Sequence, residues 1–72
     1  MRYAVVFERA SDGGWGAYAP DLPGLGAVGA TLDETRQLIS EGIAAHIDVL
    51  REARQPVPEA TTRVEEIEAP AA

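Results

Sequence analysis

The most informative absence in this 72-residue chain is cysteine, which does not occur at all. Its absence excludes disulfides and thiolate metal sites, and a single histidine supplies too few nitrogen ligands for a zinc cluster. A domain of this size buries only about 60% of its unfolded surface, and such a core seldom supplies more than roughly 3 to 5 kcal/mol. We therefore expect one small domain that gains stability by self-association.

Basic residues are also scarce, because lysine is absent and six arginines face twelve acidic residues, for a formal net charge of −6. Phosphate backbones and anionic lipids would repel such a chain, so we expect it to bind neither nucleic acid nor a membrane. The charge is compatible with a basic protein partner. The simpler and preferred explanation is that the acids keep a small domain in solution.

Long apolar runs are missing too, and none approaches the roughly 20 residues of a membrane span. The first residues, Met1-Arg2-Tyr3, lead directly into a strand-like segment and lack the charged and apolar regions of a signal peptide. A cysteine-free chain suits a reducing interior. We expect a cytoplasmic protein.

Three short strands are predicted in the first half of the chain. Residues 2–8 are rich in valine and aromatic residues and place Tyr3, Val5 and Phe7 on one face, which is typical of a strand with one buried face. The Asp-Gly-Gly step at residues 12–14 predicts a hairpin into a second strand at residues 15–19. A proline-glycine turn then reverses the chain. Residues 25–30 could form a third strand.

The clearest predicted element is a helix of about 22 residues that begins at Leu32. Thr31 is its expected cap, accepting a bond from the Glu34 amide while the Glu34 carboxylate reaches back. An apolar stripe that includes His46 faces the sheet, and prolines after the helix bar its continuation. The helix spans about 33 Å and a six-residue strand about 20 Å. The helix end should therefore overhang the sheet.

The segment after the helix is less regular. Residues 61–68 could form a fourth strand, although Val64 and Ile67 do not share a two-residue face, and residues 69–72 are expected to be a disordered tail. The predicted fold class is therefore α+β, in the order β-β-β-α-β. It comprises an antiparallel sheet of three to four strands with one long helix on one face, in a single domain at residues 1–68.

The stretch GLGAVG matches a dinucleotide-binding pattern at Gly24, Gly26 and Gly29. That fingerprint needs a helix that opens directly after the glycine turn, followed by a second parallel strand. The expected helix cap lies beyond the last glycine, and too little chain remains for the second strand. We interpret the glycines as turn and close-packing residues.

Catalytic and metal sites are also considered. Histidine is a common general acid or base, but His46 lies inside the apolar stripe, where a packed histidine is the better explanation. Glu8, Asp12 and Asp21 could gather at the sheet edge and hold a divalent ion, but they have no ligand spacing, and solvated hairpin ends explain them better. We expect no catalytic residues, metal or cofactor.

The order of motifs resembles the HicB-like antitoxin domain. YAVVFE, SDGGWGAY, PDLPG, the glycine before Ala30-Thr31 and the helix ending in a Pro-Val-Pro segment carry the resemblance, which covers nearly the whole chain. It implies a degraded ribonuclease H-like fold that forms a homodimer or homotetramer. The family pattern gives a structural role to seven residues: Pro20, Asp21, Leu22, Pro23, Gly24, Gly29 and Thr31. Gly26 is not part of that pattern.

The resemblance also implies a function. Better-known members bind and neutralise a small basic HicA toxin that cleaves mRNA, so we expect an antitoxin-type protein that occludes such a toxin. The alternative is a stand-alone homo-oligomeric structural or regulatory member without a toxin, and a further alternative is the remnant of a metal-dependent nuclease. Full-length antitoxins carry a C-terminal DNA-binding domain that we do not expect here. Expected partner contacts are Asp12, Asp48 and Glu52.

Overall fold

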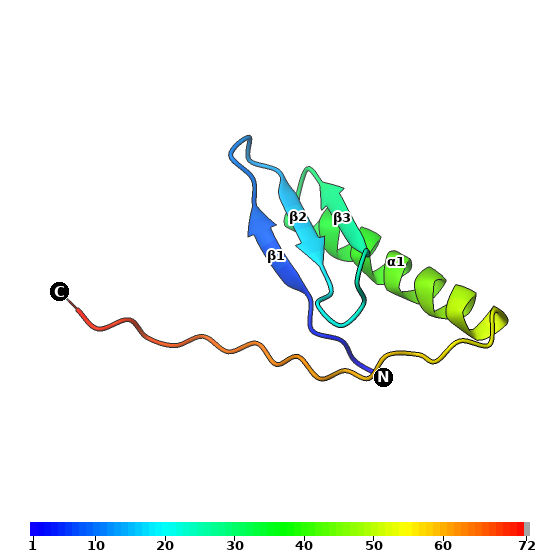
Figure 1. Ribbon diagram of the computed structural model, residues 1–72. Coiled ribbons are helices and arrows are strands. Elements are labelled where there is room, and N and C mark those ends of the chain that lie inside the picture. Colours follow the sequence, from blue (N-terminus) through cyan, green and yellow to red (C-terminus); the bar gives the residue numbers. More distant parts are fainter. Residues whose placement is uncertain (72) are drawn as a thin grey trace.

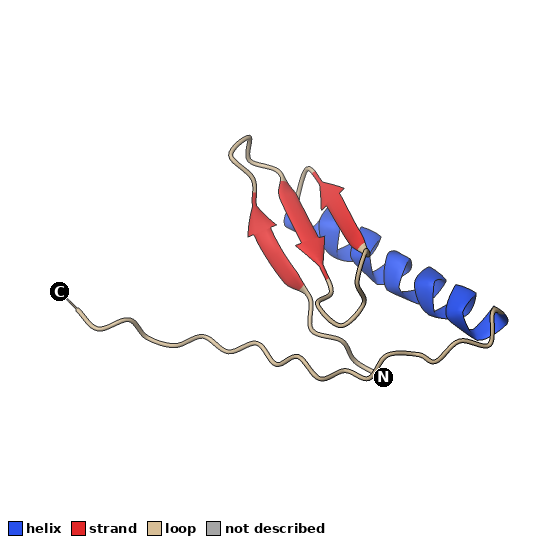
Figure 2. Ribbon diagram, viewed as in Figure 1, coloured by secondary structure: helices blue, strands red, loops and turns tan. Residues whose placement is uncertain are grey.

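The computed structural model describes residues 1–71, in which three strands precede one long helix (Figure 1). The strands are β1 (Val6–Arg9), β2 (Trp15–Tyr18) and β3 (Gly26–Gly29), which form an antiparallel sheet in the order β1-β2-β3. The helix, α1 (Leu32–Glu52), packs on one face of the sheet over β2 and β3 (Figure 2). The expected α+β class is confirmed.

The strand register separates the two faces of the sheet. Phe7 lies opposite Ala17, and Ala17 lies opposite Ala27, so these three residues share one face. Ala17 is buried, which identifies this face as the one beneath α1. On the other face, Tyr18 and Val28 are exposed, and no helix or strand in residues 1–71 covers them.

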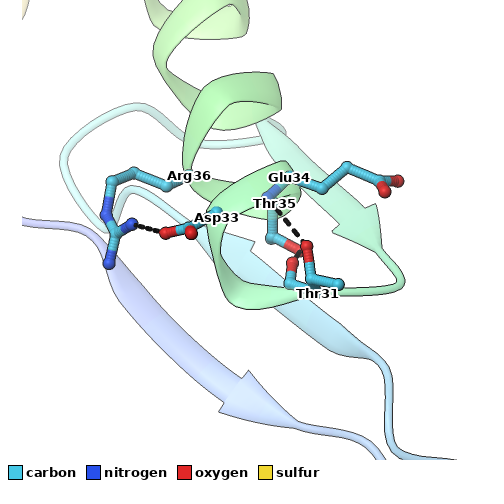
Figure 3. Close-up of polar contacts among 5 residues, drawn as sticks. All are labelled: Thr31, Asp33, Glu34, Thr35 and Arg36. Carbon is cyan, nitrogen blue, oxygen red and sulfur yellow. Dashed lines mark hydrogen bonds and ion pairs between the residues drawn. The ribbon is translucent and has the colours of Figure 1, made fainter.

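The helix begins where the capping residue predicts. Thr31 has an extended backbone, and its hydroxyl oxygen accepts a hydrogen bond of 3.1 Å from the Glu34 amide (Figure 3). The expected return bond from the Glu34 carboxylate to the Thr31 amide is not formed among the described residues, and the Glu34 side chain is exposed to solvent. In its place the buried Thr35 hydroxyl donates to the Thr31 carbonyl at 2.8 Å.

The residue that follows Ala53, the C-cap of α1, is left-handed although it is not glycine. Arg54 has a φ of 55°, and the Gln55 amide reaches back to the Leu50 carbonyl at 2.8 Å, a pattern that satisfies the last carbonyls. Pro56 then prevents further helix. Figure 1 shows the last turns of α1 extending past the sheet, as its length predicted. In residues 1–71, no helix has the length and apolar character needed to cross a membrane.

The fully buried core is small. Leu22 and Thr35 have no exposed surface, and Ile39 is only 2% exposed. Ala17 and Ala19 complete the buried set from the middle strand and the turn that follows it. The core therefore lies between the PDLPG turn, β2 and the first half of α1.

Some predicted strand boundaries were wrong. The first strand begins at Val6 instead of residue 2, and β3 covers Gly26–Gly29 instead of residues 25–30. The predicted fourth strand at residues 61–68 does not form within the described residues, because this segment leaves the body and meets no partner strand (Figure 1). Ala72, part of the predicted disordered tail, lies outside the described residues, and the disorder of that tail stays a prediction.

Candidate functional site

The PDLPG turn positions the first part of the candidate site. The Leu22 amide donates to the Ala19 carbonyl at 3.0 Å, and the Leu25 amide donates to the Leu22 carbonyl at 3.2 Å. Gly24 has a φ of 85°, a left-handed conformation that favours glycine. Since Leu22 is fully buried, the turn is anchored to the body of the domain, and this anchoring fixes the position of the neighbouring Asp21.

Asp21 binds the segment that follows the helix. Its Oδ2 accepts bonds from the amides of Thr61 and Thr62 at 3.0 and 2.9 Å. Its Oδ1 accepts bonds from the two threonine hydroxyls at 3.1 and 2.7 Å. The Thr62 amide, followed by the Thr62 hydroxyl, lowers the pKa of the Asp21 carboxyl, because both donors favour its charged form. We call Asp21, Thr61 and Thr62 the tail clamp.

A second contact fixes the same segment. The Tyr3 hydroxyl donates to the Pro58 carbonyl at 2.5 Å, and Pro58 is half-buried. The chain thus crosses one end of the sheet, past the N-terminal segment and the PDLPG turn, before it departs (Figure 1). Beyond the tail clamp, Val64 is 61% exposed and Ile67 is 89% exposed.

The opposite end of the sheet carries the β1–β2 hairpin. Asp12 accepts a bond of 2.9 Å from the Gly14 amide, and Gly13 has a φ of 91°. Next to the turn, the Arg9 guanidinium lies 5.2 Å from the centre of the Trp15 ring, within the range of a cation–π contact. An open cavity of about 440 Å³ lies at this end of the sheet. The residues that line it are Ala10, Asp12, Gly13, Gly14, Trp15, Val28, Gly29 and Ala30.

The structure does not bring the expected partner residues together. Asp48 and Glu52 are exposed and lie one helical turn apart near the end of α1. Asp12 lies at the hairpin, whereas the end of α1 extends past the other end of the sheet (Figure 1). Asp12 and the two helix acids therefore cannot form one compact patch, and their role in partner binding stays a prediction.

A longer acidic row runs along α1. Glu34, Glu41 and Asp48 are spaced seven residues apart, and Glu52 follows Asp48 one helical turn later. At about 100° per residue, the four acids fall within about 40° of the helix circumference and extend over about 27 Å. All four are exposed. We call this row the acidic stripe of α1.

Apolar side chains border the acidic stripe on one side. Leu38, Ala45 and Val49 are exposed, and they lie between the stripe and the buried face of the helix. Val49, on the overhanging turns, is 63% exposed. This border between charged and apolar side chains is typical of an amphipathic helix, and here part of its apolar side is exposed.

The other sequence candidates are placed elsewhere. Gly26 and Gly29 lie within β3, so the glycine pattern does not form a phosphate-binding loop at the start of a helix. A Cβ on Gly29 would lie 2.5 Å from the Thr35 Oγ1, which shows why this position needs glycine. His46 is half-buried on α1. Among the described residues, no three acidic, histidine or cysteine side chains are grouped to hold a metal.

Sequence reasoning missed two of these features. In the tail clamp, Asp21 is separated from Thr61 by 40 positions and from Thr62 by 41. Two adjacent threonines form no sequence pattern that points to Asp21. The acidic stripe could have been found, since a seven-residue spacing of acids on a helix is visible in the sequence.

Comparison with known protein sequences confirms the resemblance. Residues 3–71 match the family described as the HicB_like antitoxin of bacterial toxin-antitoxin systems. The UPF0150 protein ssr1765 of Synechocystis sp. is 41% identical over 56 residues, which cover 78% of this chain and 71% of that protein. No solved structure matches the chain significantly, so the ribonuclease H-like comparison stays a prediction. From residue 3 to residue 71, the chain belongs to the HicB-like antitoxin family.

Proposed function

We propose that this chain is an antitoxin that binds a small basic HicA-like toxin and prevents it from cleaving mRNA. The family supports an antitoxin-type role, and the acidic stripe of α1 is the observation that supports a basic partner. The stripe is long, exposed and bordered by Leu38 and Val49, so a partner would gain both charge pairing and apolar contact.

The proposed mechanism is occlusion. A toxin that binds RNA presents a positive surface, and the acidic stripe would speed its encounter with the antitoxin. Burial of Leu38 and Val49 would then hold the two proteins together and keep the RNA-binding face of the toxin covered. No bond needs to be made or broken by the antitoxin.

Charge reversal on α1 tests the proposal. The double variant Glu41→Arg and Asp48→Arg places two positive charges in the stripe, while Glu8→Arg and Glu59→Arg change the net charge equally at exposed positions outside it. The toxin to be titrated is the small basic product of the adjacent gene. We expect the stripe variant to bind about tenfold or more weakly, which corresponds to about 1.4 kcal/mol, and the control to bind almost normally.

Three outcomes would contradict the proposal. The first is an adjacent gene that encodes no small basic protein. The second is a basic product that does not bind this chain or retains its RNA cleavage in the complex. The third is equal weakening by both double variants, which would assign the effect to net charge instead of to the stripe.

A second candidate is a stand-alone homo-oligomer with a structural or regulatory role. It is favoured by the uncovered sheet face, where Tyr18 is 45% exposed and Val28 is 80% exposed. Light scattering that gives a multiple of the chain mass, together with a pull-down that recovers only the chain itself, would favour this candidate. Recovery of a stoichiometric basic protein would favour the antitoxin.

A further inference from the structure

The last described segment has the form of a strand without a partner. Residues 63–71 continue from the tail clamp, lie outside every helix and strand, and are exposed throughout. Figure 1 shows this segment leaving the body as a single extended trace. Nine residues at about 3.3 Å each would reach about 30 Å, which exceeds the length of β1. We call residues 63–71 the donor segment.

The sheet has an open edge at β1. β1 is the first strand in the order β1-β2-β3, so its outer backbone groups have no neighbouring strand within residues 1–71. Since α1 packs over β2 and β3, the apolar side chains of the β1 segment, including Val5 and Phe7, remain only half-buried. A further strand beside β1 would pair those backbone groups and cover those side chains.

Charge distinguishes the two edges of the sheet. The donor segment carries three glutamates, at positions 65, 66 and 68, and one arginine. The β1 segment has two arginines, Arg2 and Arg9, against one acid, Glu8. The Arg36 guanidinium, which pairs with Asp33, lies 5.9 Å from the centre of the Phe7 ring. The β3 edge has no charged residue from position 25 to position 31. The acidic segment therefore fits the β1 edge better.

We propose that the donor segment of one copy of this chain pairs with the β1 edge of a second copy. Within one chain the tail clamp directs the segment away from its own sheet (Figure 1). The same clamp fixes the start of the segment, which lowers the entropic cost of docking. A two-fold axis would let each copy donate to the other, so both β1 edges are covered. This inference goes beyond the proposed toxin binding and does not depend on it.

Truncation provides the first test. A chain that ends after Thr62 keeps the tail clamp and loses the donor segment. By multi-angle light scattering, we expect the truncated chain to have the molar mass of one chain and the full chain to have a multiple of that mass. Both should keep the circular dichroism spectrum of the helix. A truncated chain with the same multiple of mass, or a full chain that is a monomer at high concentration, would overturn the proposal.

Proline substitution tests pairing without removing the segment. Neighbouring amides of a strand point to opposite sides, and proline has no amide hydrogen. We therefore expect one of the two variants Glu65→Pro and Glu66→Pro to form an oligomer with a dissociation constant at least tenfold higher than that of the other. Glu65→Ala and Glu66→Ala are the charge-matched controls. Equal behaviour of the two proline variants would overturn backbone pairing.

Hydrogen exchange tests which edge accepts the segment. In the full chain at high concentration, we expect slow exchange at alternate amides of residues 63–68 and at the outward amides of β1. The truncated chain should lose the β1 protection, and the amides of β3 should not change between the two. Protection that appears at β3 in place of β1 would overturn the assignment. The charge reversals on α1 should leave this exchange pattern unchanged. A failure of the toxin-binding proposal can therefore be distinguished from a failure of the strand-pairing proposal.

Discussion

Asp21 and Thr62 are joined by two hydrogen bonds across 41 residues of sequence, from the Thr62 amide at 2.9 Å and from its hydroxyl at 2.7 Å. Asp21 belongs to the turn that follows β2, whereas Thr62 belongs to the segment that follows α1. The pair therefore couples the direction of the C-terminal segment to the sheet. In the proposed pairing of two copies, the direction of the donor segment depends on this contact.

Asp21→Asn should release the segment without unfolding the body. An amide side chain has one acceptor oxygen, so it cannot receive all four bonds that the two carboxylate oxygens accept from Thr61 and Thr62. We expect faster amide exchange at residues 61–62 and an unchanged helical circular dichroism spectrum. Asp12→Asn, at the hairpin, is the matched control, and loss of order at residues 61–62 in that variant would contradict a specific role for Asp21.

Acidification should open the tail clamp. The pKa of the Asp21 carboxyl is lowered from its ordinary value of 3.8, chiefly by the Thr62 amide and hydroxyl. A lowered folded-state pKa means that the clamp contributes its full stability above pH 3.8 and loses it as the pH falls through the folded-state pKa. Amide chemical shifts of Thr61 and Thr62 should report this transition, and Asp21→Asn should remove it. A midpoint above the ordinary value would contradict the hydrogen-bond geometry.

Local sequence patterns were sufficient to predict most of the fold. A two-residue alternation, the glycine-rich hairpin and the Thr31 cap correspond to elements that form. They depend on neighbours within a few positions, which a sequence displays directly. The fourth strand was different, because a strand needs a partner and the sequence does not show which edge, if any, lies beside it.

The candidate site was less predictable for the same reason. The bonds between Asp21 and the two threonines depend on the path that the chain takes after α1, and no local pattern specifies that path. Asp21 was assigned to a turn and weighed as a metal ligand, while its four donors were not foreseen. The β1–β2 hairpin, which carries Asp12, and the end of α1, which carries Asp48, lie apart (Figure 1), and this separation follows from the tertiary arrangement alone.

Thr31→Ala should weaken the start of α1. The substitution removes the hydroxyl that accepts a bond from the Glu34 amide at 3.1 Å, while the bond from the Thr35 hydroxyl to the Thr31 carbonyl can remain (Figure 3). Loss of such a cap costs about 1 kcal/mol, or about 4 to 8 °C in the melting temperature of a domain this small. Thr31→Ser keeps the acceptor and should melt close to the natural chain. Equal melting of all three would show that the cap contributes nothing.

Gly29→Val should destabilise the fold more strongly, because β3 passes close to the first turn of α1. A Cβ at position 29 would lie 2.5 Å from the Thr35 Oγ1 and 3.1 Å from the Thr35 amide nitrogen, and Thr35 is fully buried. Helix or strand must therefore shift, at a cost of about 1 to 3 kcal/mol.

The matched control for Gly29→Val is Gly16→Val, since Gly16 lies on β2 and its Cβ would lie 3.9 Å from the nearest atom, the Ala27 carbonyl oxygen. Valine also has a higher strand propensity than glycine, so the melting temperature of this control should equal or slightly exceed that of the natural chain. Gly29 has no left-handed φ, so its role is close packing and not backbone conformation. An unchanged melting temperature for Gly29→Val would contradict this packing role, because it would mean that β3 and α1 can move apart around the buried Thr35 without loss of stability.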